Sequence, residues 1–242
     1  MIAIAGLRSD GRRANEIRRL SCQMGVFDQE GCDGSAYLEQ GQTKVMCFVR
    51  GPREPDRRAE ALHNHCIIRC EFHAAPFSGT DRKKRRQGDR RSQEIAQGVR
   101  QTFEGAVMRE LYPRTQIDIH LHLLQADGGT LCACLNAASL ALVDAGVGMK
   151  DMVVACTAGF IEATPIMDLN YVEESSGGPC LPLAVMPKRN EVVLAQMDAK
   201  LPLDVFEAVL ETARQACDQV HTVLSNELRE HASKMLSCRL GI

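Results

Sequence analysis

The residues best suited to chemistry lie in a few short segments, and the first of these is strongly basic. Residues 82–91, RKKRRQGDRR, hold seven basic side chains and one acidic side chain. Such a cluster needs either solvent or a polyanion around it, and Arg90 and Arg91 could place guanidinium groups on phosphate oxygens. A solvated loop or a nuclear import signal explains the composition equally well. A smaller pair, Arg57 and Arg58, follows the turn Gly51-Pro52 and is uninformative alone.

A second segment is the turn Asp127-Gly128-Gly129-Thr130, which precedes an Ala- and Leu-rich stretch. Glycines let backbone N–H groups approach an anion, and the start of a helix carries partial positive charge. The turn is therefore a candidate phosphate cradle. A simple chain reversal is the commoner reason for two adjacent glycines, and no basic side chain stands beside the turn to complete the charge pairing.

Acidic side chains gather in a third segment. Glu162, Asp168, Glu173 and Glu174 lie within thirteen residues of one another. Carboxylates of this kind can hold Mg²⁺ or act as a general acid, although carboxylates in loops are usually only solvated.

Soft metal ligands occur together between His63 and His73, with His65, Cys66 and Cys70 between them. On a strand, Cys66 and Cys70 share a face with apolar neighbours, which is typical of a core, and zinc sites favour closely spaced cysteines on a turn. We predict no metal site here. His120 and His122 share a strand face without a nucleophile nearby in the sequence, and they receive no catalytic role.

The surrounding patterns predict the elements that must position these residues. Turn residues divide the first seventy residues into an antiparallel meander, and a polar loop over 73–91 leads into a helix with Ser92 as N-cap. Apolar and polar residues alternate over 117–123, which predicts a strand with one buried face, and the Gly-Gly turn joins this strand to a helix. The same order of strands and then helix recurs later, so an α+β fold of two related halves, about 10–148 and 149–242, is expected. The predicted strands are 44–49, 66–72, 117–123, 152–163, 181–186 and 191–197, and the predicted helices are 92–112, 131–145 and 203–234.

Composition sets the broad class. The chain has 242 residues, is 45% hydrophobic and has a net charge of −2, which excludes a disordered chain. Because residues 82–91 carry +6, the other residues sum to −8. Eleven cysteines without a C-x-x-C pair favour a reducing compartment, and no uncharged run is long or apolar enough for a membrane span. The short apolar N-terminus is unlike a signal peptide, so we expect a soluble intracellular protein.

Several strings in this order resemble the ribonuclease PH family, most closely the eukaryotic exosome ring subunit that descends from the catalytic archaeal one. The resemblance spans nearly the whole chain, and the joint order and spacing carry it. The strings are SDGRRANEIRRL at 9–20, DGSAYLEQGQTKV at 33–45, GPREP at 51–55, GDRRSQEI at 88–95, QADGGT at 125–130, NAASLALVDAGV at 136–147 and MDLNYVEES at 167–175.

The resemblance implies a ribonuclease PH-like domain of two βαβα-type halves. Six such subunits close into a ring, and single-stranded RNA passes through its channel. Active members cleave RNA from the 3′ end by phosphorolysis, in which inorganic phosphate attacks the last phosphodiester and releases a nucleoside diphosphate. This reaction needs positive charge on both phosphates and an acid or metal-holding carboxylate near the leaving oxygen.

The family's site can be carried over position by position. Its phosphate site is a Gly-Gly-Thr turn followed by an arginine; here Gly128, Gly129 and Thr130 match, but Leu131 follows. Losing such a contact costs roughly 10²–10³-fold in rate. The family's arginine motif is present as Arg91. Its acidic pattern appears as Asp168 and Glu174, which would form a vestigial acid or metal site.

We therefore expect a non-catalytic ring subunit that binds RNA through Arg90, Arg91, Arg57 and Arg58. The alternatives are an active phosphorolytic exoribonuclease and a purely structural subunit with a nuclear import signal. The resemblance implies as partners other ring subunits, RNA-binding cap subunits, a hydrolytic nuclease and single-stranded RNA, without a membrane. It implies the nucleus, nucleolus and cytoplasm as locations. No cofactor is expected, and Mg²⁺ would be needed only for residual activity.

Overall fold

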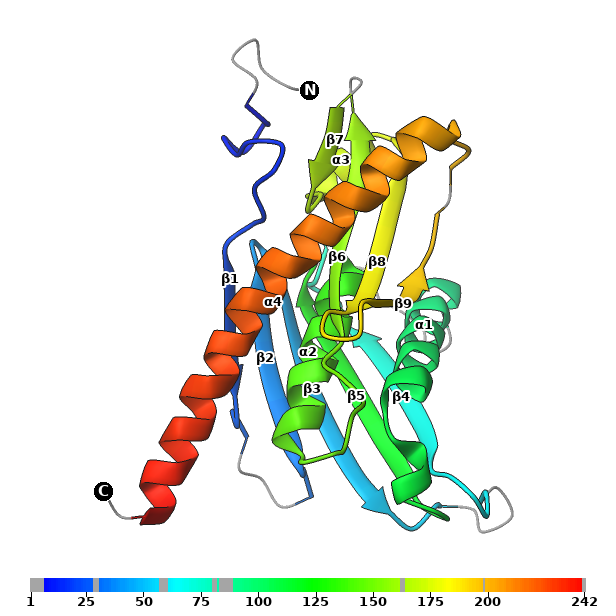
Figure 1. Ribbon diagram of the computed structural model, residues 1–242, viewed down its shortest axis with the longest axis vertical. Helices are drawn as coiled ribbons and strands as arrows, with labels where there is room; N and C mark the ends of the chain where they lie inside the picture. The colour runs from blue at the N-terminus through cyan, green and yellow to red at the C-terminus, as the bar shows by residue number, and fades with distance from the viewer. Residues whose placement is uncertain are drawn as a thin grey trace.

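Two β-sheets enclose a central helix, a second helix packs beside it on the first sheet, and a long helix covers the outer face of the second sheet (Figure 1). The computed structural model describes residues 7–27, 31–56, 61–79, 82, 89–161, 164–197 and 199–240. The first sheet has five strands in the order β1-β2-β3-β5-β4, and the second has four in the order β7-β6-β8-β9. The strands are β1 (Leu20–Met24), β2 (Gly34–Gln40), β3 (Thr43–Arg53), β4 (Ile67–Ala74), β5 (Gln116–Gln125), β6 (Val154–Ile161), β7 (Thr164–Met167), β8 (Cys180–Met186) and β9 (Glu191–Ala195).

The central helix is α2 (Thr130–Asp144), which packs on β2 and β3 of the first sheet and on β6 and β8 of the second. Every residue from Cys132 to Leu142 is buried. A helix that is apolar all round must be covered on every side, so α2 forms the middle of the core.

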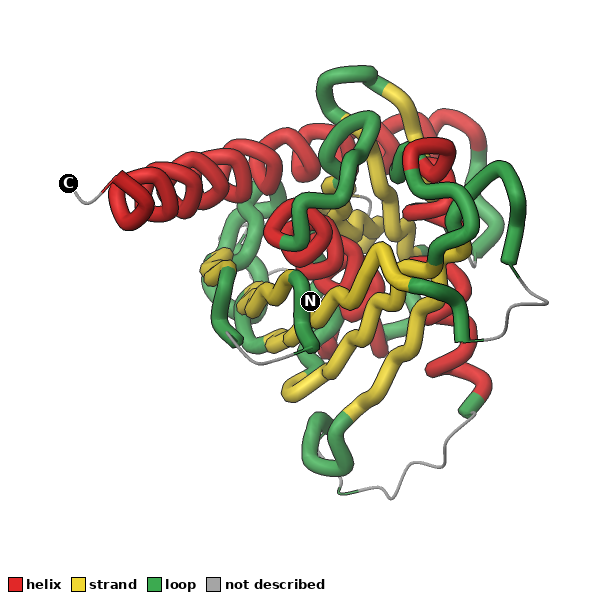
Figure 2. The backbone as a smooth tube through the Cα atoms, turned by 90° about the horizontal axis from the view of Figure 1, so that it is seen from below, coloured by secondary structure: helices red, strands yellow, loops and turns green. Residues whose placement is uncertain are grey.

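Two further long helices pack on the sheets: α1 (Arg90–Ala106) lies beside α2, and α4 (Leu203–Leu240) lies on the other face of the second sheet. α1 packs on β4 and β9, and α4 crosses β6 and β8. The buried stripe of α4 includes Val209, Ala213, Cys217, Val220 and Leu224 at three- and four-residue steps. The end of α4 projects beyond the sheets (Figure 2). The described residues also include a five-residue helix, α3 (Tyr171–Ser175), and a 3₁₀ helix at Arg109–Leu111.

This arrangement confirms the α+β prediction, while several details differ. The expected meander is wrong at β4, which pairs in parallel with β5 instead of following β3. Alternation specifies which face of a strand is buried but not which strand lies beside it. The helix after the basic loop begins at Arg90 with Asp89 as N-cap, so Ser92 lies in the first turn. That helix ends at Ala106, and the acidic segment expected to be a loop contains α3.

Candidate functional site

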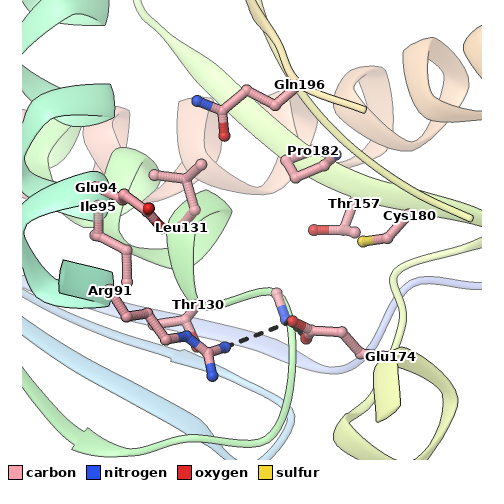
Figure 3. A pocket seen from close by; sticks show the side chains of 11 residues that line it. Arg91, Glu94, Ile95, Thr130, Leu131, Thr157, Glu174, Cys180, Pro182 and Gln196 are labelled. Carbon is pink, nitrogen blue, oxygen red and sulfur yellow. Dashed lines mark hydrogen bonds and ion pairs between the residues drawn. The ribbon is translucent and has the colours of Figure 1, made fainter. Parts of the chain in front are cut away.

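A cavity of about 160 Å³ lies where α1, α2 and the second sheet meet (Figure 3). It contains the Gly-Gly-Thr turn, the arginine at the start of α1 and one carboxylate from α3. We call it the turn pocket. Its lining residues are Arg91, Glu94, Ile95, Gly129, Thr130, Leu131, Thr157, Glu174, Cys180, Pro182 and Gln196.

The turn itself requires glycine. Gly128 and Gly129 have φ angles of +78° and +60°, a conformation that side chains rarely adopt. A Cβ atom on Gly128 would lie 2.6 Å from the backbone carbon of Asn170. Glycine therefore lets the segment before α3 approach the turn closely, and Gly129 becomes the left-handed N-cap of α2.

A buried ion pair braces the turn from behind. Arg18 donates to Asp168 from Nε at 3.0 Å and from Nη2 at 2.8 Å, and both side chains are almost completely buried. Arg18 also donates to the carbonyl oxygens of Asp127 and Gly128. Burial opposes the charge on Arg18, but the nearby Asp168 carboxylate outweighs it and raises the pKa of Arg18. One guanidinium thus connects the chain before β1 to the turn and to the segment before α3.

Further contacts complete this brace. Gln40 Nε2 donates to Asp168 Oδ1 at 2.8 Å, and the Thr43 hydroxyl donates to the Gly128 carbonyl oxygen at 2.9 Å. Asp168 has a φ of +50°, so its own backbone is held in a strained conformation by these partners. Arg8 pairs with Glu173 and donates to the Asp168 carbonyl oxygen at 2.9 Å. These contacts give Asp168 a structural environment outside the turn pocket.

Glu174 occupies the anion-binding side of the turn. The backbone N–H of Gly129 donates to Glu174 Oε2 at 3.1 Å. Arg91 Nη2 lies 3.7 Å from Glu174 Oε1, and Figure 3 shows the two side chains directed toward each other. A carboxylate of the chain itself therefore holds the N–H group and the cation that an external anion would use.

Leu131 adds an apolar side chain to the same wall. It follows Thr130 in the first turn of α2, and a Cβ atom on Gly98 of α1 would lie 3.5 Å from Leu131 Cδ1. The side chain therefore packs toward α1 and offers nothing to neutralise a dianion. Among the lining residues, the charged groups are Arg91, Glu94 and Glu174.

The other predicted RNA contacts lie outside the turn pocket or outside the described residues. The Arg90 side chain is 92% exposed and pairs with Glu94 at 2.9 Å, one turn along α1. Arg82 is exposed. Arg57, Arg58 and the basic residues 83–86 fall outside the part of the chain that the structure describes.

The two predicted acidic residues both lie beside Gly129 but in different environments: the Gly129 N–H donates to Glu174 Oε2, and a Cβ atom on Gly129 would lie 3.9 Å from Asp168 Oδ1. Glu174 lines the turn pocket, whereas Asp168 is fully buried against Arg18. Arg18, Thr157 and Cys180 are site residues that the sequence interpretation missed. Arg18 lies within the quoted string 9–20, which was a usable signal, but Thr157 and Cys180 reach the pocket only through strand pairing.

No group of three or more His, Cys, Asp and Glu side chains in the described part of the chain is arranged to hold a metal ion, and this includes the predicted soft ligands His63, His65, Cys66, Cys70 and His73. No helix among the described residues has the length and apolar character needed to cross a bilayer.

Comparison with known proteins identifies the family. The 3′ exoribonuclease family matches with its domain 1 at residues 16–148 and its domain 2 at residues 151–216. The chain is 49% identical to the exosome complex component RRP41 of Homo sapiens, over 96% of this chain and 94% of that protein. It is 46% identical to the RRP41 homolog of Arabidopsis thaliana, over 95% of each chain. It is 42% identical to Rrp41 of Methanopyrus kandleri, again over 95% of each.

Solved structures agree in fold. Rice (Oryza sativa) Rrp46 superposes with a TM-score of 0.81 at 23% identity, over 92% of this chain and 100% of that chain. An Archaeoglobus fulgidus exosome with RNA bound to the active site gives a TM-score of 0.76 at 22% identity, over 90% of this chain and 92% of that chain. The two sheets, the glycine turn with its brace and the extent of these matches lead to one conclusion: the chain belongs to the 3′ exoribonuclease family, the ribonuclease PH family.

Proposed function

We propose that this chain is a non-catalytic ring subunit of an RNA exosome. In this role it binds single-stranded RNA and guides it through a central channel for 3′-to-5′ processing and degradation, in rRNA maturation and mRNA turnover. The relatives named as exosome components, at 42–49% identity across nearly the full chain, support the assembly.

The contact between Gly129 and Glu174 carries the non-catalytic part of the proposal. Phosphorolysis needs a phosphate dianion held by N–H groups and cations beside the scissile bond. Here the Gly129 N–H already donates to Glu174, and Arg91 faces the same carboxylate. An entering phosphate would meet that negative charge, and Leu131 supplies no compensating cation.

The guiding role depends on arginines that remain available to a polyanion. The Arg91 side chain is 69% exposed although it lines the turn pocket, and Arg90 is more exposed still. Exposed guanidinium groups bind phosphate oxygens without reading the base sequence. The basic residues 82–86 would extend this surface, and Arg57 and Arg58 would contact RNA at the neck of the channel.

An active phosphorolytic exoribonuclease is the second candidate, and the position of Arg91 favours it. Arg91 contacts the pocket that contains the glycine turn. If Glu174 moved aside, Arg91 could take the place of the arginine missing at position 131. Mg²⁺ would then be required only for that residual activity, and the guiding role needs no cofactor.

The partners and locations follow from the same proposal. The neighbours would be other ribonuclease PH-like ring subunits and RNA-binding cap subunits, and an attached hydrolytic nuclease would degrade the RNA. The protein would work in the nucleus and nucleolus and also in the cytoplasm. A purely structural subunit would keep the protein partners and lose the RNA contact.

Crosslinking of RNA to the assembled ring tests the guiding role. Charge reversal of Arg90 and Arg91 to Glu should reduce crosslinking, because two phosphate contacts become repulsive. The matched control reverses Arg189, an exposed arginine paired with Glu191 after β8, and should leave crosslinking unchanged. Equal crosslinking by all three proteins would favour the purely structural subunit.

A further inference from the structure

A row of aromatic rings crosses the outer face of the first sheet and shares no residue with the lining of the turn pocket. The Phe27 and Phe48 ring centroids lie 5.1 Å apart, and Phe48 lies 5.6 Å from His122. His122 stacks on His73 at 5.5 Å with an interplanar angle of 28°. The rings come from the segment after β1 and from β3, β5 and β4, so the row runs across the strands.

The row lies on the side of the sheet that faces away from α2. Successive side chains of a strand point to opposite faces. Val45, Cys47 and Val49 of β3 are buried in the core with α2, so Phe48 points the other way. Together with Cys32, Arg50 and His120, the row lines a cavity of about 380 Å³. We call this surface the ring row.

Charged groups around the ring row leave one cation without an acidic partner. Arg50 is exposed and forms no ion pair with the described residues. Two acidic side chains lie on this face. Glu71 is 3.6 Å from His73 and 3.5 Å from His120. Asp118 of β5 is opposite Arg50 in the β3–β5 pair, but it forms its ion pair with Arg53. The guanidinium of Arg50 therefore stands two residues from Phe48 on the same face of β3, free to meet an anion.

We propose that the ring row is a second binding site for single-stranded RNA, at which bases stack on Phe48 and His122 and a backbone phosphate pairs with Arg50. Open sheet faces with aromatic side chains bind single strands in this way, because every base has a π-face. The inference rests on the proposed function only for the choice of RNA as the nucleic acid.

Binding and crosslinking of the full chain to a 4-thiouridine-containing oligouridylate test the proposal. Phe48→Leu and His122→Leu keep apolar volume and remove the ring, and each should weaken binding about fivefold to a hundredfold. Met46→Leu is the matched control on the same face of β3 and should bind like the native chain. Circular dichroism confirms that each variant is folded.

The crosslinked peptides separate this proposal from the proposed function. Crosslinks in β3 or β5 that persist when Arg90 and Arg91 are changed to Glu support the ring row. Crosslinks confined to residues 89–95 overturn the ring row and leave the guiding role standing, and crosslinks in the sheet alone do the reverse. If the sheet crosslinks vanish when the chain assembles with other ring subunits, the face is a protein interface and the proposal is wrong.

Discussion

Arg18→Met removes the guanidinium that braces the glycine turn while keeping most of the side-chain stem. In the native chain Arg18 has 5% and Asp168 0% side-chain exposure, so both charges depend on each other for compensation. Removing one partner of a buried pair leaves an uncompensated charge. This typically lowers the free energy of unfolding by about 3–5 kcal/mol.

The contacts that survive favour the lower part of this range. After Arg18→Met, Asp168 keeps the hydrogen bonds from Gln40 Nε2 and from the backbone N–H of residue 18, each 2.8 Å long. The Gly128 carbonyl oxygen keeps the Thr43 hydroxyl. The Asp127 carbonyl oxygen loses its guanidinium donor. We therefore expect Arg18→Met to lower the free energy of unfolding by about 3 kcal/mol, the lower end of the range for such pairs.

Urea unfolding followed by circular dichroism measures this loss. With a slope of about 3 kcal/mol per molar urea, a loss of about 3 kcal/mol lowers the midpoint by about 1 M. Asp168→Asn removes the negative charge of the pair. Asparagine is chosen because it also tolerates the positive φ of position 168. The double variant Arg18→Met/Asp168→Asn should recover about 1–3 kcal/mol of the loss, because the stranded charge is gone.

Arg90→Met is the matched control, because it removes an arginine whose side chain is 92% exposed. Its midpoint should equal that of the native chain. The reasoning fails if Arg18→Met unfolds at the same urea concentration as Arg90→Met. It also fails if the effects of Arg18→Met and Asp168→Asn simply add, since that would mean the two side chains do not depend on each other.

Three other variants test the turn, the anion side of the turn pocket and the histidines. Gly128→Ala should lower the urea midpoint, because its Cβ would lie 2.6 Å from the Asn170 backbone at a φ of +78°; an unchanged midpoint would show that the turn can relax. Glu174→Gln should bind inorganic phosphate about tenfold more tightly than the native chain in calorimetry, because the competing charge is removed. Glu94→Gln is the control. Equal phosphate affinities of Glu174→Gln and the native chain would argue against Glu174 occupying the anion-binding side of the turn. Burial and the neighbouring His73 and His120 lower the pKa of His122 below its usual 6.5, so the unfolded chain binds more protons below that pH. Stability should therefore fall as the pH drops through 6.5, and His122→Gln should weaken this dependence in urea midpoints at pH 5.5 and 7.5; an unaltered slope would assign the effect to other groups.

The spacing of apolar residues along the sequence predicts the strands and helices that bury one regular face. The alternation over 117–123 became β5, and the stripe beginning at Leu203 became α4, because burial on one face dominates both segments. The segment 131–145 was recognised as a helix from its Ala and Leu content. Its central position between two sheets depends on strand pairs that are distant in sequence, and local patterns do not contain them.

In the candidate site, too, the sequence reveals some residues, while others are placed only by contacts between segments distant in sequence. The glycine turn and Arg91 were found from residue types, and they do line one pocket. The string 9–20 signals that its segment matters, but nothing in it shows which of its arginines will be buried, so the sequence interpretation misses Arg18. Asp168 and Glu174 were grouped by proximity in the sequence. The positive φ at Asp168 and the start of α3 turn the two side chains to different surroundings.

Phosphate-dependent release of nucleoside diphosphates from a 3′-labelled RNA decides whether this chain is a non-catalytic ring subunit. The ring is assembled from this chain and the other ring subunits, without a hydrolytic nuclease, and products are followed with and without inorganic phosphate. A Leu131→Arg ring provides the matched comparison, because it restores the missing cation and should recover part of the activity if Glu174 still serves as the acid or metal ligand. A non-catalytic subunit releases no nucleoside diphosphate from the native ring under either condition. Release that requires phosphate and is lost on Arg91→Ala would contradict the non-catalytic role and identify the chain as an active phosphorolytic exoribonuclease.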